Sequence, residues 1–238
     1  ISAFRHMAQA RHVGKVVIGN MKPETPRNAQ ASGFKGFVPK GTYLISGGLG
    51  DLGIVVAEWM TGQGARHLVL TGRNPAKPHI MKIIEQLRGD GAEIVVINGD
   101  VSAEKDVEAL FETIRNTLPE LKGIVHAAGV LDDGMLIDQN WDRFLKVMAP
   151  KVNGAWNLHR FSLGTSLDFF VMFSSAASLM GNPGQGSYSA ANAFLDALAH
   201  YRRAEGLPAS TINWGPWSQV GMAVQRDRGD RLLAQGVK

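Results

Sequence analysis

Three side chains between residues 171 and 198 have the types and spacing needed to act on a carbonyl group. Ser175 ends an apolar run, Tyr188 follows thirteen positions later, and Asn192 lies four beyond Tyr188. Residues four apart share one helical face, and a strand end, a Gly/Pro-rich loop and a helix start can bring the serine to the same point. There a phenol can donate a proton while a hydroxyl polarises the carbonyl oxygen. The alternative is that Tyr188 is an ordinary core residue and that the serines are a strand end and a cap.

A nearby ammonium group would help this phenol to act near neutral pH. Free tyrosine has a pKa of about 10, and a neighbouring positive charge favours its phenolate. The candidate is Lys151, in the helical pattern that precedes the apolar run. Asn192 could orient this lysine or order a water that resupplies the proton. The alternative for Lys151 is an exposed helical lysine, which is the commoner environment.

Strand and helix patterns that could position these residues alternate from Thr42 onward. The expected strands are 43–46, 67–71, 93–98, 123–126, 167–173 and 209–214. The expected helices are 52–63, 80–88, 103–116, 141–161 and 188–205. The first has apolar positions at Leu52, Val55, Val56 and Trp59, the third has Ser102 as its N-cap, and the fourth has a kink near Pro150. Strands separated by helices imply crossovers that cover both faces of a sheet. The sequence therefore predicts an α/β fold, a Rossmann-type doubly wound parallel sheet with helices on both faces.

A glycine-rich loop follows the first strand and points to a dinucleotide. Gly48, Gly50 and Gly53 have the spacing G-x-G-x-x-G, with a helical pattern beyond them. Such glycines let the backbone approach a pyrophosphate, which the helix N-terminus stabilises. The predicted cofactor-binding residues of this loop are Gly48, Leu49, Gly50, Leu52 and Gly53. The alternative is a tight turn with close helix packing.

The ends of the next three strands add to the predicted cofactor site. The second strand ends in Thr-Gly-Arg-Asn without an acidic residue, so Arg73 is expected to bind the 2′-phosphate of NADPH, unless it is a solvated turn arginine. The other candidates are Asp100 and Val101 beside the adenine, and Ala127, Ala128 and Gly129 beside a ribose. His126 is expected to pack or to support the site rather than to take part in catalysis.

Several stretches together resemble a known enzyme family. The stretches SGGLGDLG, LTGRN, HAAGVLDD, APKVNGAWNLH, FSSAAS, YSAANAFLDALA and INWGPW lie within residues 42–222. They resemble the catalytic half of a ketoreductase domain from a modular polyketide synthase or the related animal-type fatty acid synthase, within the short-chain dehydrogenase/reductases. Most members of that superfamily carry the lysine four residues after the tyrosine. Here Asn192 stands there, and the family pattern matches Lys151 on the preceding helix.

The resemblance implies a reaction and its partners. It implies NADPH-dependent reduction of a β-ketoacyl thioester to a β-hydroxyacyl thioester, with the acyl chain on the phosphopantetheine arm of an acyl carrier protein. Tyr188 would donate the proton, Ser175 would hold the carbonyl oxygen, Lys151 would tune the phenol and anchor the cofactor ribose, and Asn192 would support the proton relay.

A second group of residues bears on stereochemistry. Leu131, Asp132 and Asp133 resemble the LDD motif of B-type reductases, which give D-configured β-hydroxyl groups. Met180 stands eight residues before Tyr188, where the opposite class has tryptophan, and Ala190 replaces the proline of the epimerising subgroup. The loop would fix which face of the ketone meets the hydride. The alternative is that Asp132 and Asp133 only cap the next segment. Residues 215–222 resemble a flexible lid.

Three regions are expected along the chain. Residues 1–20 resemble the carboxyl end of an enoylreductase domain, which implies a fully reducing module. Residues 21–40 contain Pro23, Pro26 and Pro39 and read as a linker. Residues 41–238 read as the catalytic subdomain of the ketoreductase. The family's structural half, and a final strand and helix, would belong to a complete domain.

Composition excludes several other function classes. Of 238 residues, 45% are hydrophobic and 19% charged, which is typical of a globular protein. The absence of cysteine excludes disulfides and thiolate metal sites and fits a cytoplasmic location. The net charge of +4 is mild and scattered, so neither nucleic acid nor a membrane is an expected partner. The remaining alternatives are a non-catalytic structural module and a free-standing carbonyl reductase.

Overall fold

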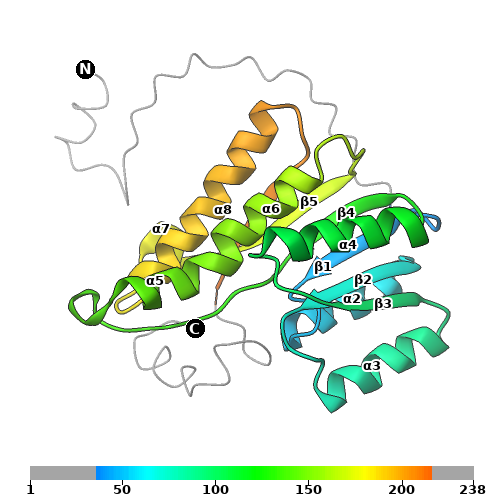
Figure 1. The fold of residues 1–238 in the computed structure, drawn as a ribbon, viewed down its shortest axis with the longest axis horizontal. Helices are drawn as coiled ribbons and strands as arrows, with labels where there is room; N and C mark the ends of the chain where they lie inside the picture. Colours follow the sequence, from blue (N-terminus) through cyan, green and yellow to red (C-terminus); the bar gives the residue numbers. More distant parts are fainter. Residues whose placement is uncertain (1–35, 216–238) are drawn as a thin grey trace, which may run out of the picture. The chain divides into compact units, whose positions relative to one another are not determined.

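The computed structural model describes residues 36–215, which form a six-stranded sheet in which every pairing is parallel (Figure 1). The order across the sheet is β3-β2-β1-β4-β5-β6. The strands are β1 (Thr42–Ser46), β2 (His67–Gly72), β3 (Glu93–Asn98), β4 (Leu121–His126), β5 (Phe169–Ser175) and β6 (Ser210–Trp214). This order and direction confirm the predicted Rossmann-type sheet.

Helices form a layer on each face of the sheet (Figure 1). On one face lie α4 (Glu104–Thr117), α6 (Gly154–Phe161) and α8 (Gly186–Ala204), and on the other lie α2 (Asp51–Gly62) and α3 (Pro78–Gly89). Alternate residues of β1 face the two layers: Leu44 packs with α4 and α6, while Tyr43 and Ile45 pack with α2 and α3. All three are fully buried, as expected for a central parallel strand.

The strand order reverses between β1 and β4, and we call the carboxyl edge of the sheet at this switch point the crevice. From β1 the chain proceeds outward to β2 and β3, then returns to β4 on the other side of β1. Ligands of open parallel sheets bind at the carboxyl ends of the strands where the order reverses. The strand ends at and beside this crevice are Ser46, His126 and Ser175.

The predicted helix 141–161 is three consecutive elements. They are α5 (Trp141–Met148), a π-helical turn η2 (Ala149–Asn153) and α6. Pro150 lacks an N–H and cannot donate the regular helical bond, so the widened turn falls where the kink was predicted. Lys151 lies within this turn. Two short elements were not predicted, η1 (Leu136–Asp138) and α7 (Ala177–Met180).

Two local predictions are wrong. In α2 the buried face is formed by Gly53, Ile54, Ala57, Met60 and Thr61, whereas Trp59 is 58% exposed. The tight packing of Gly53 on the glycine loop orients the helix, so Leu52, Val55 and Val56 are only partly buried.

The second wrong prediction is the cap of α4, which is Ala103 rather than Ser102. The Ser102 hydroxyl instead donates a 2.7 Å hydrogen bond to Asp100 Oδ1 within the preceding turn. This local bond competes with capping, as serine and aspartate commonly do in turns.

Gly123 in β4 provides a test of the packing at the sheet. A Cβ at this position would overlap the ring of Phe169, which stacks on Tyr43 at a centroid distance of 5.7 Å. Replacing Gly123 by alanine is expected to lower the free energy of unfolding by about 1–3 kcal/mol through overpacking. Urea denaturation measures this change. Gly89→Ala is the matched control, because nothing lies within 4 Å of its Cβ position; equal stability of the two variants would contradict this account.

Some predictions lie outside the described residues. These are the enoylreductase-like segment 1–20, residues 21–35 of the predicted linker, and all of the predicted lid except Gly215. The onset of regular structure is described: β1 begins at Thr42, one residue before the first expected strand at 43–46. None of the helices within residues 36–215 has the length and apolar character that crossing a lipid bilayer requires.

Candidate active site

The predicted catalytic residues come together at the carboxyl ends of β4 and β5. Lys151 is held by η2, Ser175 ends β5, and Tyr188 lies in the first turn of α8. The Nζ atom of Lys151 lies 5.6 Å from the centroid of the Tyr188 ring. A lysine on the preceding helix therefore reaches the tyrosine, as the sequence predicted.

Lys151 is a buried lysine rather than a surface residue. Its side chain is 3% exposed, and Nζ donates a 2.8 Å hydrogen bond to the carbonyl oxygen of Phe173. Burial lowers the pKa of Lys151 to about 8, while the negative charge of Asp196 opposes that shift. At neutral pH most molecules therefore keep the ammonium form, with a proton that is unusually easy to release.

Tyr188 is a partly buried phenol in this structure. Burial raises its pKa above the usual value, whereas hydrogen bonding with the side chains of Asn192 and Ser175 lowers it by less. The net shift is upward, whereas the sequence suggested that the lysine favours phenolate. The raised pKa keeps the phenol protonated at neutral pH, the form that a proton donor needs.

Asn192 is fully buried one helical turn after Tyr188. Its Nδ2 donates a 2.8 Å hydrogen bond to the carbonyl oxygen of Tyr188. Its Oδ1 atom is buried and has no hydrogen-bond partner among the residues described. Because a buried carbonyl without a partner is costly, this oxygen is a natural acceptor for a bound water or a ligand.

Ser175 is oriented by the chain that follows it. Its Oγ atom accepts a 3.2 Å hydrogen bond from the backbone N–H of Ala177 at the start of α7. This contact uses a lone pair, so the hydroxyl proton is left for a second partner, which is the Tyr188 phenol in this structure and would be a substrate oxygen in the reaction. The neighbouring Ser174 donates a 3.2 Å hydrogen bond to the carbonyl oxygen of Asn192, which joins the end of β5 to α8.

The glycine loop forms a cradle between β1 and α2. A Cβ at Gly53 would overlap the carbonyl oxygen of Gly47, so only glycine allows the helix to start this close to the strand. At Gly50, the N-cap of α2, the nearest atom to a Cβ would be 3.4 Å away, and the residue is exposed. Gly50 therefore presents open backbone at a helix N-terminus, the arrangement that accepts a pyrophosphate.

The leucines of this loop have structural positions. Leu49 is buried, and its Cβ lies 3.2 Å from the position of a Cβ on Gly72 at the end of β2. Leu52 is partly buried against the α2 and α3 layer, and Gly48 packs on Leu70. Any contact of Leu49 or Leu52 with a cofactor would therefore run mainly through the backbone.

The other predicted cofactor residues surround the same crevice. Arg73 is exposed just after β2. Asp100 and Val101 form the turn after β3, with Val101 packed into the core and its carbonyl oxygen accepting a 3.0 Å hydrogen bond from Asn157. Ala127 donates a 2.9 Å backbone hydrogen bond to Ser46, and Ala128 lies against Gly47. Gly129 is half-buried beyond them.

His126 fits the supporting position that was expected of it. It is fully buried, with Nδ1 2.6 Å from the hydroxyl of Ser46. Burial, together with the positive charge of Lys151, lowers its pKa to about 3. A histidine that stays neutral throughout the physiological range is unsuited to proton transfer there.

The segment with the LDD pattern is tied to two helices. Asp132 accepts a 2.9 Å hydrogen bond from Nε of Arg143 in α5, and Lys146 lies 3.3 Å from the same carboxylate. Asp133 accepts a 3.3 Å hydrogen bond from Nε2 of Gln185, the N-cap of α8. The residues that cap the next two helices are Met135 and Asn140, so neither aspartate is a cap. Leu131 is half-buried before them, and Met180 is 80% exposed at the end of α7.

A comparison with known protein families identifies the family of this chain. The KR domain family matches residues 41–219. The chain belongs to the KR domain family. A phenolphthiocerol/phthiocerol polyketide synthase protein of Mycobacterium tuberculosis (strain ATCC 25618 / H37Rv) is 40% identical over 227 residues, which cover 93% of this chain. The phthioceranic/hydroxyphthioceranic acid synthase of Mycobacterium bovis (strain BCG / Pasteur 1173P2) is 42% identical over 228 residues, 92% of this chain.

The chain spans only about 10% of the length of each of these two synthases. Solved ketoreductases have the same fold. A ketoreductase domain from the bacillaene assembly line is 37% identical with a TM-score of 0.78, covering 83% of this chain and 49% of that one. An A1-type ketoreductase is 35% identical, also with a TM-score of 0.78, covering 94% and 44%. Since an A1-type enzyme is as similar, overall fold does not distinguish the stereochemical classes, and the B-type assignment stays a prediction.

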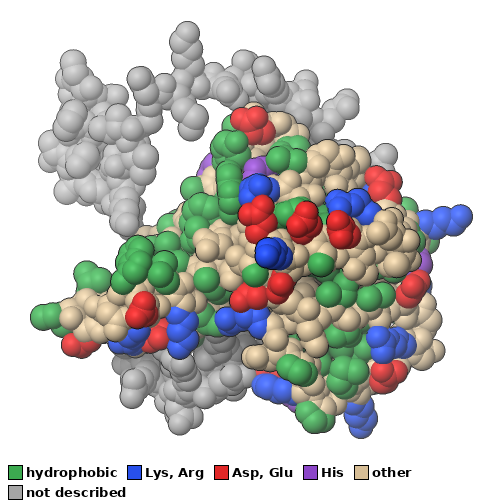
Figure 2. Space-filling view, in the orientation of Figure 1, with side chains coloured by type: hydrophobic (Ala, Val, Ile, Leu, Met, Phe, Trp, Pro, Cys, Tyr) green, Lys and Arg blue, Asp and Glu red, His purple; other side chains and the backbone are tan. Residues whose placement is uncertain are grey.

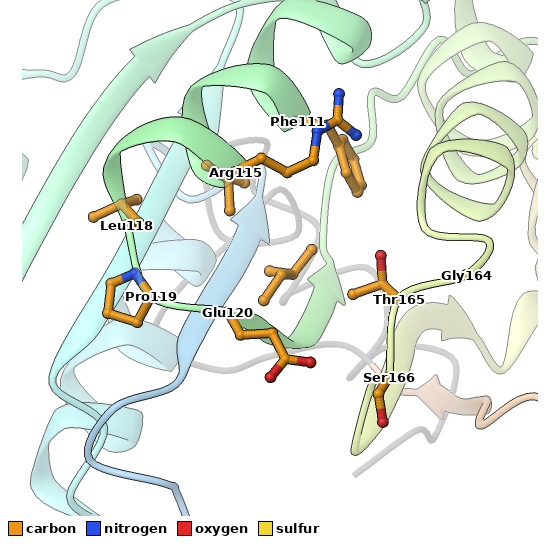
Figure 3. Close-up of a pocket in the computed structure, with 10 residues that line it drawn as sticks. Phe111, Arg115, Leu118, Pro119, Glu120, Gly164, Thr165 and Ser166 are labelled. Atoms are coloured by element: carbon orange, nitrogen blue, oxygen red, sulfur yellow. The ribbon is translucent and has the colours of Figure 1, made fainter.

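A cavity of about 390 Å³ lies elsewhere in this KR domain (Figure 3). It is lined by the end of α4, the loop into β4 and residues 164–166 before β5. These segments are at the amino ends of the strands, opposite the predicted catalytic residues. No three His, Asp or Glu side chains within residues 36–215 are grouped so that they could hold a metal ion.

Sequence reasoning missed part of this site. The acceptor for Lys151 is a backbone carbonyl, at Phe173, and no residue type signals it. Asp196 in α8 also acts on Lys151, and Asn213 in β6 hydrogen-bonds with Asp196. Asp196 did carry a signal, because it continues the i, i+4 series from Tyr188 and Asn192 on a face that is otherwise buried.

Proposed function

We propose that this KR domain reduces a β-ketoacyl thioester, carried on the phosphopantetheine arm of an acyl carrier protein, to a D-β-hydroxyacyl thioester with NADPH. The observation that carries the proposal is the position of the Lys151 ammonium over the Tyr188 ring. Ser175 and Asn192 hydrogen-bond with the same phenol. This group lies at the crevice edge that also carries the open glycine loop.

The residues around the crevice fit a nicotinamide dinucleotide. The exposed backbone at Gly50 and the N-terminus of α2 would hold its pyrophosphate. Lys151 would hold the nicotinamide ribose, and Arg73 the 2′-phosphate. When bound, the cofactor supplies the hydride for the reduction.

The chain's own side chains would supply and replace the proton. Tyr188 keeps its proton at neutral pH and would donate it to the ketone oxygen, while the Ser175 hydroxyl donates a hydrogen bond to the same oxygen. The resulting phenolate would be stabilised by the adjacent Lys151 ammonium. The buried Oδ1 of Asn192 would hold a water through which the proton is replaced.

Arg73 offers a test of the cofactor assignment. Removing its guanidinium in Arg73→Ala is expected to raise the KM for NADPH about 10–100-fold, because a charge-assisted pair with the 2′-phosphate is lost. The KM for NADH, which has no such phosphate, should stay nearly unchanged. Steady-state kinetics with both cofactors measures the preference. An unchanged NADPH/NADH preference would show that Arg73 is only a turn residue.

The contacts of the LDD segment support a role in stereochemistry. Arg143 and Gln185 bind the two aspartates, so residues 132–133 are tied both to α5 and to the residue three positions before Tyr188. A segment fixed in this way would present one face of the ketone to the hydride. The D configuration of the product follows only from the resemblance to B-type reductases.

Exposed apolar side chains near Tyr188 support an acyl substrate. Leu136 lies 3.8 Å from the position of a Cβ on Gly186, two residues before Tyr188, and is 77% exposed. Figure 2 shows hydrophobic side chains gathered at the left end of the molecule, where Figure 1 places α5 and α7. The exposed large residues of this region are Met135, Leu136, Ile137, Trp141, Leu145, Leu179 and Met180. We expect part of this surface to contact the acyl-pantetheine chain.

The direct experiment is an NADPH-oxidation assay on a β-ketoacyl pantetheine thioester, followed by chiral analysis of the product. We expect NADPH consumption and a D-configured alcohol. An L-configured product would refute the B-type assignment but not the reduction. A folded protein that consumes no NADPH, with folding checked by circular dichroism, would favour the alternative of a non-catalytic structural module.

The remaining parts of the proposal concern the larger assembly. The matched synthases are much longer than this chain, and we propose that the KR domain works beside other synthase domains, including its structural half and an enoylreductase. We also propose a cytoplasmic location. A free-standing carbonyl reductase, the other alternative, would reduce small ketones that lack a pantetheine arm as fast as it reduces the β-ketoacyl pantetheine thioester.

A further inference from the structure

Asp196 lies in α8, eight residues after Tyr188 and four after Asn192. Its Oδ2 accepts a 2.6 Å hydrogen bond from the hydroxyl of Ser178 in α7. It also accepts a 3.0 Å hydrogen bond from Nδ2 of Asn213 in β6, whose distance to Oδ1 is 3.2 Å. The half-buried carboxylate therefore joins three elements that are far apart in the sequence.

The amide of Asn213 extends this network to the end of β5. Besides Asp196, its Nδ2 lies 2.9 Å from the Ser178 hydroxyl, 3.2 Å from the Ser174 hydroxyl and 3.4 Å from the carbonyl oxygen of Ser175. An amide nitrogen has only two hydrogens, so the shorter contacts to Ser178 and Asp196 are the main ones. Ser175 therefore lies between two members of this network in the sequence, Ser174 before it and Ser178 after it.

Ser174 closes the network back onto the catalytic helix. Its hydroxyl donates to the carbonyl oxygen of Asn192, one turn before Asp196. The strand end that carries Ser175 is thus bound to α8 directly at Asn192 and, through Asn213 of β6, indirectly at Asp196 one turn later. Buried and half-buried networks of this kind rigidify the groups that they join when every member has a partner.

Asp196 also acts on the buried ammonium of Lys151. The charged or titratable groups that bear on Lys151 are Asp196 and Tyr188 from α8 and His126 from β4. His126 is neutral at physiological pH and Tyr188 keeps its proton, so neither balances the positive charge. The negative charge of Asp196, on the helix that carries Tyr188, favours the charged form of Lys151.

We propose that Asp196 is a positioning residue for the reduction: it fixes the Ser175 end of β5 against the catalytic helix and supplies the negative charge that balances Lys151. This inference rests on the proposed function, in which Tyr188 and Lys151 act as a pair. It predicts two separable effects of Asp196, one on geometry and one on the protonation of Lys151.

Kinetics of variants of the full chain separate these effects. Asp196→Asn keeps the shape and removes the charge; we expect kcat near neutral pH to fall about tenfold. The alkaline limb of the profile of kcat/KM for NADPH against pH should move down by about 0.5–1 pH unit. Asp196→Glu restores the charge and should return that limb to its original position while kcat stays reduced. Ser178→Ala removes one donor to the carboxylate and should lower kcat about 2–5-fold without moving the limb.

Glu205→Gln is the matched control, an exposed carboxylate at the C-cap of the same helix. It should leave kcat and the pH profile unchanged. A wild-type kcat and alkaline limb in Asp196→Asn would overturn the proposal. If circular dichroism shows that Asp196→Asn does not fold, the other two variants decide, and wild-type kcat in both would overturn it.

The parallel variant Tyr188→Phe keeps this test separate from that of the proposed function. Full activity of Tyr188→Phe would refute the catalytic pair itself, whatever Asp196 does. Loss of activity in Tyr188→Phe, together with wild-type behaviour of the Asp196 variants, would refute only the role of Asp196.

Discussion

Tyr188→Phe is expected to lower kcat for β-ketoacyl thioester reduction about 10²–10⁴-fold, because it removes only the proton donor. The ring stays in place beside Lys151, so the KM for NADPH should change less than about threefold. Steady-state NADPH oxidation gives both constants. A loss confined to kcat would mark the phenol hydroxyl as a group that acts in the transition state rather than in binding.

Tyr201→Phe is the matched control for this variant. Tyr201 lies on the same helix and is 48% exposed. Its hydroxyl is far along α8 from the predicted site, so kcat should be unchanged. Equal activity of Tyr188→Phe and the wild-type chain would contradict the proposed mechanism.

The second large effect is expected at Lys151, and it should appear in the pH dependence of kcat/KM for NADPH. With a pKa of about 8, its ammonium is present below that pH and is lost as the pH rises through it. If the ammonium is required, kcat/KM for NADPH should fall about tenfold per pH unit above this pKa, because this constant reports ionisations of the free enzyme. Lys151→Met should lower kcat/KM about 100-fold or more at neutral pH and abolish this alkaline fall.

The control for Lys151→Met is Lys105→Met, which removes an exposed lysine of α4. It should retain the wild-type rate and the same alkaline limb. A pH profile that stays flat between about pH 7 and 10 in the wild-type chain would show that the protonation of Lys151 does not limit the reaction.

Ser175 and Lys151 depend on β5 in different ways. The strand ends with a side chain at the site, Ser175, but it also contributes the carbonyl oxygen of Phe173, to which Lys151 donates. Parallel strands leave such groups at their carboxyl ends, where no further strand residue pairs with them. A small shift of β5 would therefore move the hydroxyl and the ammonium together.

Local patterns were sufficient for the sheet and for placing the candidate site residues on its elements. Apolar runs separated by helical patterns predicted all six strands, and the short-range spacing of Tyr188 and Asn192 placed both on one face of α8. The glycine loop could be read partly because local packing requires glycine at Gly48 and Gly53, where a Cβ would overlap Ile45 and Gly47 respectively. These features depend on neighbours within a few residues, which is why the chain alone reveals them.

Packing between distant segments decided the points that the sequence left open. Trp59 was expected with the apolar face of its helix but is exposed, because the contact of Gly53 with the loop sets the rotation of α2. The net upward shift of the Tyr188 pKa is also a tertiary effect, since burial outweighs the side-chain hydrogen bonds.

Local periodicity and residue type were enough to predict the α/β class and the succession of strands, and to propose residues for dinucleotide binding and proton transfer. Folding in three dimensions was needed to show that Lys151 lies buried over Tyr188 with Phe173 as its acceptor. It was also needed to show that Asp196 links α8 to α7 and β6. These contacts join residues that lie between 17 positions apart, for Asp196 and Asn213, and 37 positions apart, for Lys151 and Tyr188. Distances across such separations are set by how the sheet and helices pack, which no local pattern encodes.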